Sequence, residues 1–147
     1  MAKVTFILGL CGSGKTFLAK QLKVKTGAEI FEGVAGSHNP NGMSEMLDRL
    51  RRGMDCIVEE IAYCCSHSRD VVVSALCSQV PEVQVEWICF ENDLASANWN
   101  VEHRADAAKQ DIPGHVDINR KYHCVYTYPE GAKIVPITRV SESGAIA

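Results

Sequence analysis

Residues 9–16 spell GLCGSGKT and follow the pattern G-x-x-x-x-G-K-[ST]. Glycines in this pattern let successive backbone N–H groups point inward as an anion-binding nest, and the positive end of the following helix adds to it. The lysine of the pattern reaches the β- and γ-phosphates of a nucleoside triphosphate, and the last hydroxyl binds the Mg²⁺ that bridges them. The stretch therefore predicts a loop that binds ATP, or another nucleoside triphosphate, together with Mg²⁺.

The sequence on either side matches the setting that such a loop needs. Residues 3–8 (KVTFIL) are largely β-branched, aromatic or apolar, which is typical of a strand buried on both faces of a parallel sheet. Apolar residues return at helical spacing after the loop, until Gly27 ends the segment. We therefore expect nucleotide contacts from this loop and the first helical turn, namely Gly9, Cys11, Gly12, Ser13, Gly14, Lys15, Thr16 and Phe17.

The rest of the chain alternates between strand-like and helix-like segments. Strands joined by helices form right-handed crossovers, which build a parallel sheet covered by helices on both faces. We therefore predict an α/β fold, a three-layer sandwich with a mainly parallel five-stranded sheet. The further expected strands are 28–31, 56–58, 83–90 and 133–137, and the further expected helices are 44–52, 69–79, 93–108 and 115–126, with a loop through 113–114.

Length and composition narrow the protein class. At 147 residues the chain fits one domain, 1–147, because domains average about 150 residues. The net charge of −3 provides no general attraction to nucleic acid or to an anionic membrane, and no apolar run approaches the roughly 18 residues of a membrane span. The seven cysteines are odd in number, and several lie in apolar runs, as buried free thiols do. With no signal-peptide pattern, these features predict a cytoplasmic protein.

Acidic residues follow two of the expected strands. Glu59 and Glu60 end the third strand, where an acid beside a phosphate-binding loop can hold the metal ion. Glu59 is the expected metal-side residue, together with Thr16, and the alternative is a solvated pair that opens a loop. Glu32 follows the short second strand at the edge where ligands of open α/β sheets bind, so it is a candidate general base. An exposed glutamate without a catalytic role is the alternative there.

Basic residues gather on and after the helix expected at 93–108. Phosphoryl transfer needs positive charge over the transferring group, and a segment that closes over the site can supply it while excluding water. We expect a lid-like segment at about 93–114, with Arg104 as its catalytic residue beside His103 and Lys109. Because acidic residues are interspersed with these bases, an ordinary ion-paired surface is the alternative.

The phosphate-binding loop, the strand-end acids and the basic segment follow one another in an order that resembles the P-loop kinase superfamily. The similarity is to its adenylate-kinase-like and polynucleotide-kinase-like group, and it extends loosely through 90–93 into the expected lid. It implies Mg²⁺-ATP as donor and a hydroxyl or phosphate acceptor. Lys15 and Thr16 would bind phosphate and metal, Glu32 would take the acceptor-side carboxylate role, and Arg104 the lid role. These kinases usually have an aspartate at the acceptor side and two or more lid arginines, where this chain has Glu32 and the pair His103 and Arg104.

Two functions remain open from the sequence. The first is a kinase that moves the γ-phosphoryl group of ATP to a small molecule, a nucleoside or nucleotide, or the 5′-hydroxyl of a polynucleotide, with nucleic acid bound only as such a substrate end. The second is a P-loop ATPase or nucleotide switch that acts through a protein partner. The sequence has no N-K-x-D motif, which argues against a guanine-specific switch. No feature of the expected acceptor loop, 33–42, names the acceptor.

Overall fold

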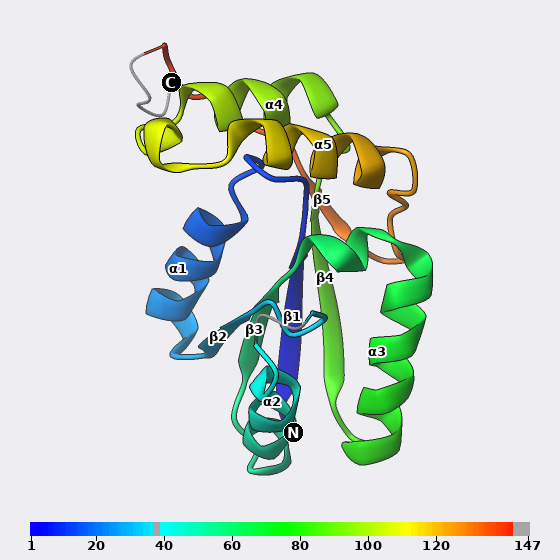
Figure 1. Ribbon diagram of the computed structural model, residues 1–147. Helices are drawn as coiled ribbons and strands as arrows, with labels where there is room; N and C mark the ends of the chain where they lie inside the picture. The colour runs from blue at the N-terminus through cyan, green and yellow to red at the C-terminus, as the bar shows by residue number, and fades with distance from the viewer. Residues whose placement is uncertain (37–38, 143–147) are drawn as a thin grey trace.

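Five parallel strands form the centre of the computed structural model, which describes residues 1–36 and 39–142 (Figure 1). The strand order is β2-β3-β1-β4-β5, so the first strand of the chain lies in the middle of the sheet. The sheet confirms the predicted α/β class, and the described strands are parallel throughout. Their bounds are β1 Lys3–Leu8, β2 Glu29–Glu32, β3 Cys56–Glu59, β4 Gln84–Phe90 and β5 Lys133–Val135.

Helices cover both faces of the sheet and one of its ends. Helix α1 lies on one face, α2 and α3 lie on the other, and α4 and α5 run across the end at which β1 and β4 finish (Figure 1). The phosphate-binding loop reaches this same end directly after β1. The bounds are α1 Lys15–Thr26, α2 Gly42–Arg51, α3 Ser66–Gln79, α4 Leu94–His103 and α5 Ile112–His123, with short 3₁₀ turns η1 Ile61–Cys64 and η2 Ala107–Lys109.

The alternation of side chains along β1 divides the core in two. Val4, Phe6 and Leu8 are fully buried with α2 and α3, and the Phe6 ring stacks on Trp87 of β4 at 4.5 Å between centroids. Ile7 faces the other way and packs with α1. Both faces of β1 are therefore buried, which holds the start of the phosphate-binding loop in a fixed position.

The structure corrects several predicted boundaries, and two of them affect the site. The helix predicted at 93–108 ends at His103, because Arg104 adopts an extended backbone with φ −65° and ψ 157°. The loop predicted through 113–114 is wrong, because Pro113 and Gly114 belong to the first turn of α5. Asp111 caps that turn by accepting the Gly114 N–H at 3.1 Å, and proline suits a first helical turn.

The other boundary changes are small. Helices α2 and α3 begin before the predicted residues 44 and 69, β2 is shifted by one residue so that it includes Glu32, and β5 ends at Val135 rather than at 137. Residues 37 and 38 of the expected acceptor loop lie outside the described ranges. Across those ranges, no helix combines the length and the apolar character that crossing a membrane requires.

Candidate functional site

The phosphate-binding loop has the backbone that its glycines predict. Gly12 and Gly14 have φ values of +85° and +110°, a left-handed conformation that other residues rarely adopt. The N–H groups of Gly12, Gly14, Lys15 and Thr16 have no acceptor within the described part of the chain. The last two belong to the first turn of α1, where N–H groups lack partners inside the helix. The loop therefore presents several free N–H donors to an anion.

Lys15 is held against its own loop. Its Nζ donates hydrogen bonds to the carbonyl oxygens of Gly9 at 2.8 Å and Leu10 at 3.0 Å. Phosphate oxygens are stronger partners for an ammonium group than neutral carbonyls are, because both partners are then charged. The side chain is thus kept beside the loop in the ligand-free protein and is available to a phosphate group.

Thr16 and Glu59 meet across α1 and β3. The Thr16 hydroxyl donates to Oε1 of Glu59 at 2.7 Å, whereas Oε2 of Glu59 is buried and has no hydrogen-bond partner in the described chain. Burial raises the pKa of the Glu59 carboxyl, and the hydrogen bond from Thr16 opposes that shift. A carboxylate oxygen that is buried without a partner is the arrangement a cation would satisfy.

The donor set fits Mg²⁺ held mainly by a nucleotide. Mg²⁺ prefers oxygen ligands and commonly binds proteins through one or two side chains, with phosphates and water completing its shell. The hydroxyl of Thr16 and the carboxylate of Glu59 supply such ligands, and the described residues contain no cluster of three or more His, Cys, Asp or Glu side chains that could hold a metal alone. Glu60 has another role, because its side chain accepts the Ala62 N–H at 3.1 Å and caps η1.

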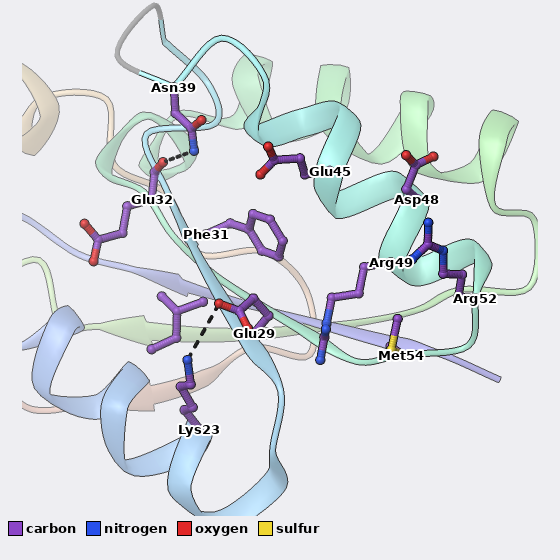
Figure 2. Close-up of a pocket in the computed structure, with 11 residues that line it drawn as sticks. Lys23, Glu29, Phe31, Glu32, Asn39, Glu45, Asp48, Arg49, Arg52 and Met54 are labelled. Atoms are coloured by element: carbon purple, nitrogen blue, oxygen red, sulfur yellow. Dashed lines mark hydrogen bonds and ion pairs between the residues drawn. The ribbon is translucent and has the colours of Figure 1, made fainter.

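Glu32 lies beside Glu59, because strand register pairs these two residues at the ends of β2 and β3. It lines the same cavity as the phosphate-binding loop and also borders a second cavity of about 680 Å³ between β2 and α2. Figure 2 shows its carboxylate turned away from α2, while Asn39 donates to its main-chain carbonyl at 3.1 Å. A molecule in the second cavity would therefore meet Glu32 at the boundary between the two.

Arg104 follows the last turn of α4 and also lines the first cavity. Its Nη2 lies 3.3 Å from Nδ1 of His115 on α5, and its Nε lies 3.2 Å from a carboxylate oxygen of Asp106. His103, by contrast, stacks on Trp99 at 3.8 Å between ring centroids and does not line the cavity. The guanidinium is thus close to the site and pairs with Asp106 by distance, but its buried Nε–H forms no hydrogen bond within the described residues.

The first cavity, of about 890 Å³, collects most of the residues that the sequence singles out. All of the predicted nucleotide-contact residues line it except Gly9, which lies behind the loop and accepts a hydrogen bond from Lys15. The catalytic and metal roles assigned to these residues remain predictions. Those that line the cavity are Cys11, Gly12, Ser13, Gly14, Lys15, Thr16, Phe17, Glu32, Glu59 and Arg104.

Several solved structures have a fold similar to that of this chain. No protein-family model and no curated protein matches the chain. Among solved structures, a gluconokinase from Sinorhizobium meliloti 1021 superimposes with a TM-score of 0.61 at 15% identity, covering 93% of this chain and 83% of that one. A sugar kinase from Janibacter sp. HTCC2649 gives 0.56 at 16% identity, covering 92% of this chain and 86% of that one. The chain shares the fold of these two kinases.

Within this fold, sequence reasoning missed several residues of the cavity. His115 stands beside Arg104, and Asn100 lines the wall formed by α4. The segment after β5 also lines the cavity, through Pro136, Thr138 and Val140. Isolated histidines and asparagines in helices have no distinctive spacing, so nothing in the sequence marks them as belonging to the site.

Proposed function

We propose that the protein is an ATP-dependent kinase that transfers the γ-phosphoryl group to the hydroxyl of a small molecule, a nucleoside or nucleotide, or the 5′ end of a polynucleotide. The observation that carries this proposal is the single cavity shared by the phosphate-binding loop, the Thr16–Glu59 pair, Glu32 and Arg104. An ATPase or switch needs the first two of these features. An acceptor-side carboxylate and a basic group opposite it are what phosphoryl transfer adds.

The donor half of the cavity suits a magnesium nucleotide. The free N–H groups of the loop would bind phosphate oxygens, and Lys15 would exchange its carbonyl partners for the β- and γ-phosphates. Thr16 and Glu59 would hold Mg²⁺, which neutralises phosphate charge when it is bound. The other end of the cavity, lined by Val135, Pro136 and Val140, is apolar and suits the base and ribose.

The acceptor half requires Glu32. Its carboxylate would accept the proton of the attacking hydroxyl as the acceptor oxygen bonds to the γ-phosphorus and the bond to the ADP leaving group breaks. Arg104 would move from Asp106 onto the transferring group, where its charge stabilises the transition state. That movement defines the function proposed for the lid-like segment at 93–114.

Phosphate transfer from labelled ATP tests this function directly. The protein is incubated with Mg²⁺ and a panel of nucleosides, nucleotides, 5′-hydroxyl oligonucleotides and small sugars, and labelled acceptor and free phosphate are counted in parallel. We expect label on one acceptor class. Free phosphate alone, or bound ATP without turnover, would instead favour the ATPase or switch.

Replacing Glu32 by Gln tests the acceptor side. The carboxamide cannot take the proton, so we expect transfer to fall by about 100-fold or more while the Kd for ATP stays within about twofold. The control is Glu86→Gln, because Glu86 lies on β4, is paired with Lys3 at 3.1 Å and lines neither cavity. Unchanged transfer in Glu32→Gln would remove Glu32 from the mechanism.

A further inference from the structure

Two buried asparagines, one on α4 and one on α5, form hydrogen bonds with the main chain of the phosphate-binding loop. Asn119 of α5 is fully buried, and its Oδ1 accepts the Cys11 N–H at 2.7 Å while its Nδ2 donates to the Cys11 carbonyl at 2.9 Å. Asn100 of α4 is 5% exposed and donates to the Gly12 carbonyl at 2.9 Å. Through these side-chain amides the two residues contact three consecutive peptide groups of the loop.

The hydrogen bonds of Asn119 determine the direction in which the Gly12 N–H points. The Cys11 carbonyl and the Gly12 N–H belong to one trans peptide, in which the two bonds point in opposite directions. Because Asn119 holds the carbonyl, the Gly12 N–H points away from Asn119, and Gly12 lines the cavity. Asn119 also satisfies the partly buried Cys11 N–H, for which the described residues provide no other acceptor.

The hydrogen bonds of Asn100 join the phosphate-binding loop to the segment that follows β5. The Asn100 Nδ2 also donates to the Thr138 carbonyl at 2.9 Å, and its Oδ1 accepts the Val140 N–H at 2.8 Å. One amide thus connects Gly12 with the segment after β5. Helix α4 is therefore attached to two chain segments that line the cavity.

We propose that Asn119 and Asn100 are positioning residues that orient the loop N–H groups for phosphate and attach the start of the lid-like segment to the loop. The inference rests on the kinase function proposed above. It limits the part that can close over the site to the residues between α4 and α5, which include Arg104. Neither asparagine reacts; each acts through the peptide groups that it holds.

Asn119→Leu tests the hydrogen bonds between Asn119 and Cys11, because leucine keeps the volume of the side chain and removes all of its hydrogen bonds. Two quantities are measured: amide hydrogen exchange at Cys11 in the ligand-free protein, and the Kd for inorganic triphosphate. We expect exchange at Cys11 to accelerate by at least about tenfold. The Kd should rise by about 10- to 100-fold, because a misdirected loop N–H loses its hydrogen bond to a charged phosphate oxygen. Asn119→Ala serves as the second variant if the leucine protein does not fold.

Leu76→Ala is the control for lost stability, because Leu76 is fully buried on α3 and does not line the cavity. It should speed exchange across the whole protein without a selective effect at Cys11, and it should leave the Kd within about twofold. Unchanged exchange at Cys11 in the Asn119 variants, or selective exchange with an unchanged Kd, would overturn the positioning role alone. A wild-type protein that binds neither triphosphate nor ATP would overturn the proposed function as well.

Discussion

At the scale of one residue, the Glu59 carboxylate of the candidate site lowers the stability of the ligand-free fold. Its carboxylate is buried beside Thr16 with one oxygen unpartnered, and burial raises its pKa. A raised pKa in the folded state means that the charged form is held less well in the fold than in the unfolded chain. The ligand-free fold therefore loses stability as pH rises through this pKa, and a cation at the site would reverse that loss.

Glu59→Gln should consequently stabilise the ligand-free protein and weaken its use of Mg²⁺. We expect the Tm at neutral pH to rise by about 2 °C, because an amide is cheaper to bury than a carboxylate. The gain should shrink as pH falls and wild-type Glu59 becomes protonated. Thermal unfolding across a pH series measures the first effect, and a Mg²⁺ titration of activity measures the second. A lower Tm at neutral pH would contradict this account of Glu59.

Arg69 is a buried charge with a structural role. Its Nη1 donates to the carbonyls of Tyr63 at 2.8 Å and Cys64 at 2.9 Å, and its Nη2 donates to the Thr127 hydroxyl at 2.7 Å. The side chain is 6% exposed and, across the described residues, forms no ion pair with a carboxylate. Its hydrogen bonds connect η1, which follows β3, with the segment that follows α5.

Arg69→Met should lower the free energy of unfolding by about 2–4 kcal/mol, because the buried carbonyls of Tyr63 and Cys64 each lose a hydrogen bond from a charged donor. Arg51→Met is the control, since Arg51 is an exposed residue paired with Asp48 at 3.1 Å and should change stability by less than about 1 kcal/mol. Urea denaturation measures both. Equal effects of the two substitutions would show that the buried hydrogen bonds of Arg69 contribute little.

At the scale of elements, α4 and the phosphate-binding loop touch closely enough to require a glycine. A Cβ on Gly12 would collide with the Ala97 carbonyl oxygen and crowd Val101, both on α4. Gly27, which ends α1, has the same left-handed backbone, with φ +74°, but open space around the position of a Cβ. Substituting Gly27 by alanine therefore strains only the backbone, whereas the same substitution at Gly12 strains the backbone and also creates a steric clash.

Gly12→Ala should therefore destabilise the protein more than Gly27→Ala does. We expect about 1 kcal/mol for Gly27→Ala, from backbone conformation alone, and about 3 kcal/mol or more for Gly12→Ala, which must also displace α4. Chemical denaturation compares them, and triphosphate binding should be lost only in the Gly12 variant. Similar losses of stability would mean that α4 can move aside at little cost.

The elements also show what a sequence can and cannot predict. The strands were predictable because buried parallel strands are continuous apolar runs, and the loop 9–16 because its chemistry needs a fixed spacing. The end of α4 was missed because Arg104 leaves the helix without a glycine or proline to mark the boundary. The first turn of α5 was missed because Pro113 and Gly114 suggest a turn until Asp111 is seen to cap the helix.

The contacts of Asn119 and Asn100 belong to the same group of missed features. Asn119 meets Cys11 across 108 positions of sequence, and Asn100 meets Gly12 across 88. Long-range contacts of this kind depend on how helices pack at the end of the sheet, which local periodicity does not specify. The pairing of Glu32 with Glu59 likewise depends on strand register, which becomes visible only in the folded sheet.

At the scale of the whole molecule, ligand binding and folding are linked. A ligand that binds only the folded state stabilises it by about 2.7 kcal/mol at 100 times its Kd. For a domain of this length, Mg²⁺-ATP at that concentration should raise the Tm by about 5–10 °C. Lys15→Ala should abolish most of this shift, whereas Lys25→Ala, in the last turn of α1 and outside the cavity, should retain it. An equal shift in Lys15→Ala would contradict the role of the loop.

The central place of β1 affects how the chain can fold during its synthesis. Register pairs Val4 with Cys56 on one side and with Val85 on the other, so both neighbours of the first strand are made long after it. A ribosome therefore releases the apolar residues of β1 well before any partner strand exists to cover them. The strand that leads into the phosphate-binding loop therefore stays uncovered on the nascent chain until both of its neighbours have been made.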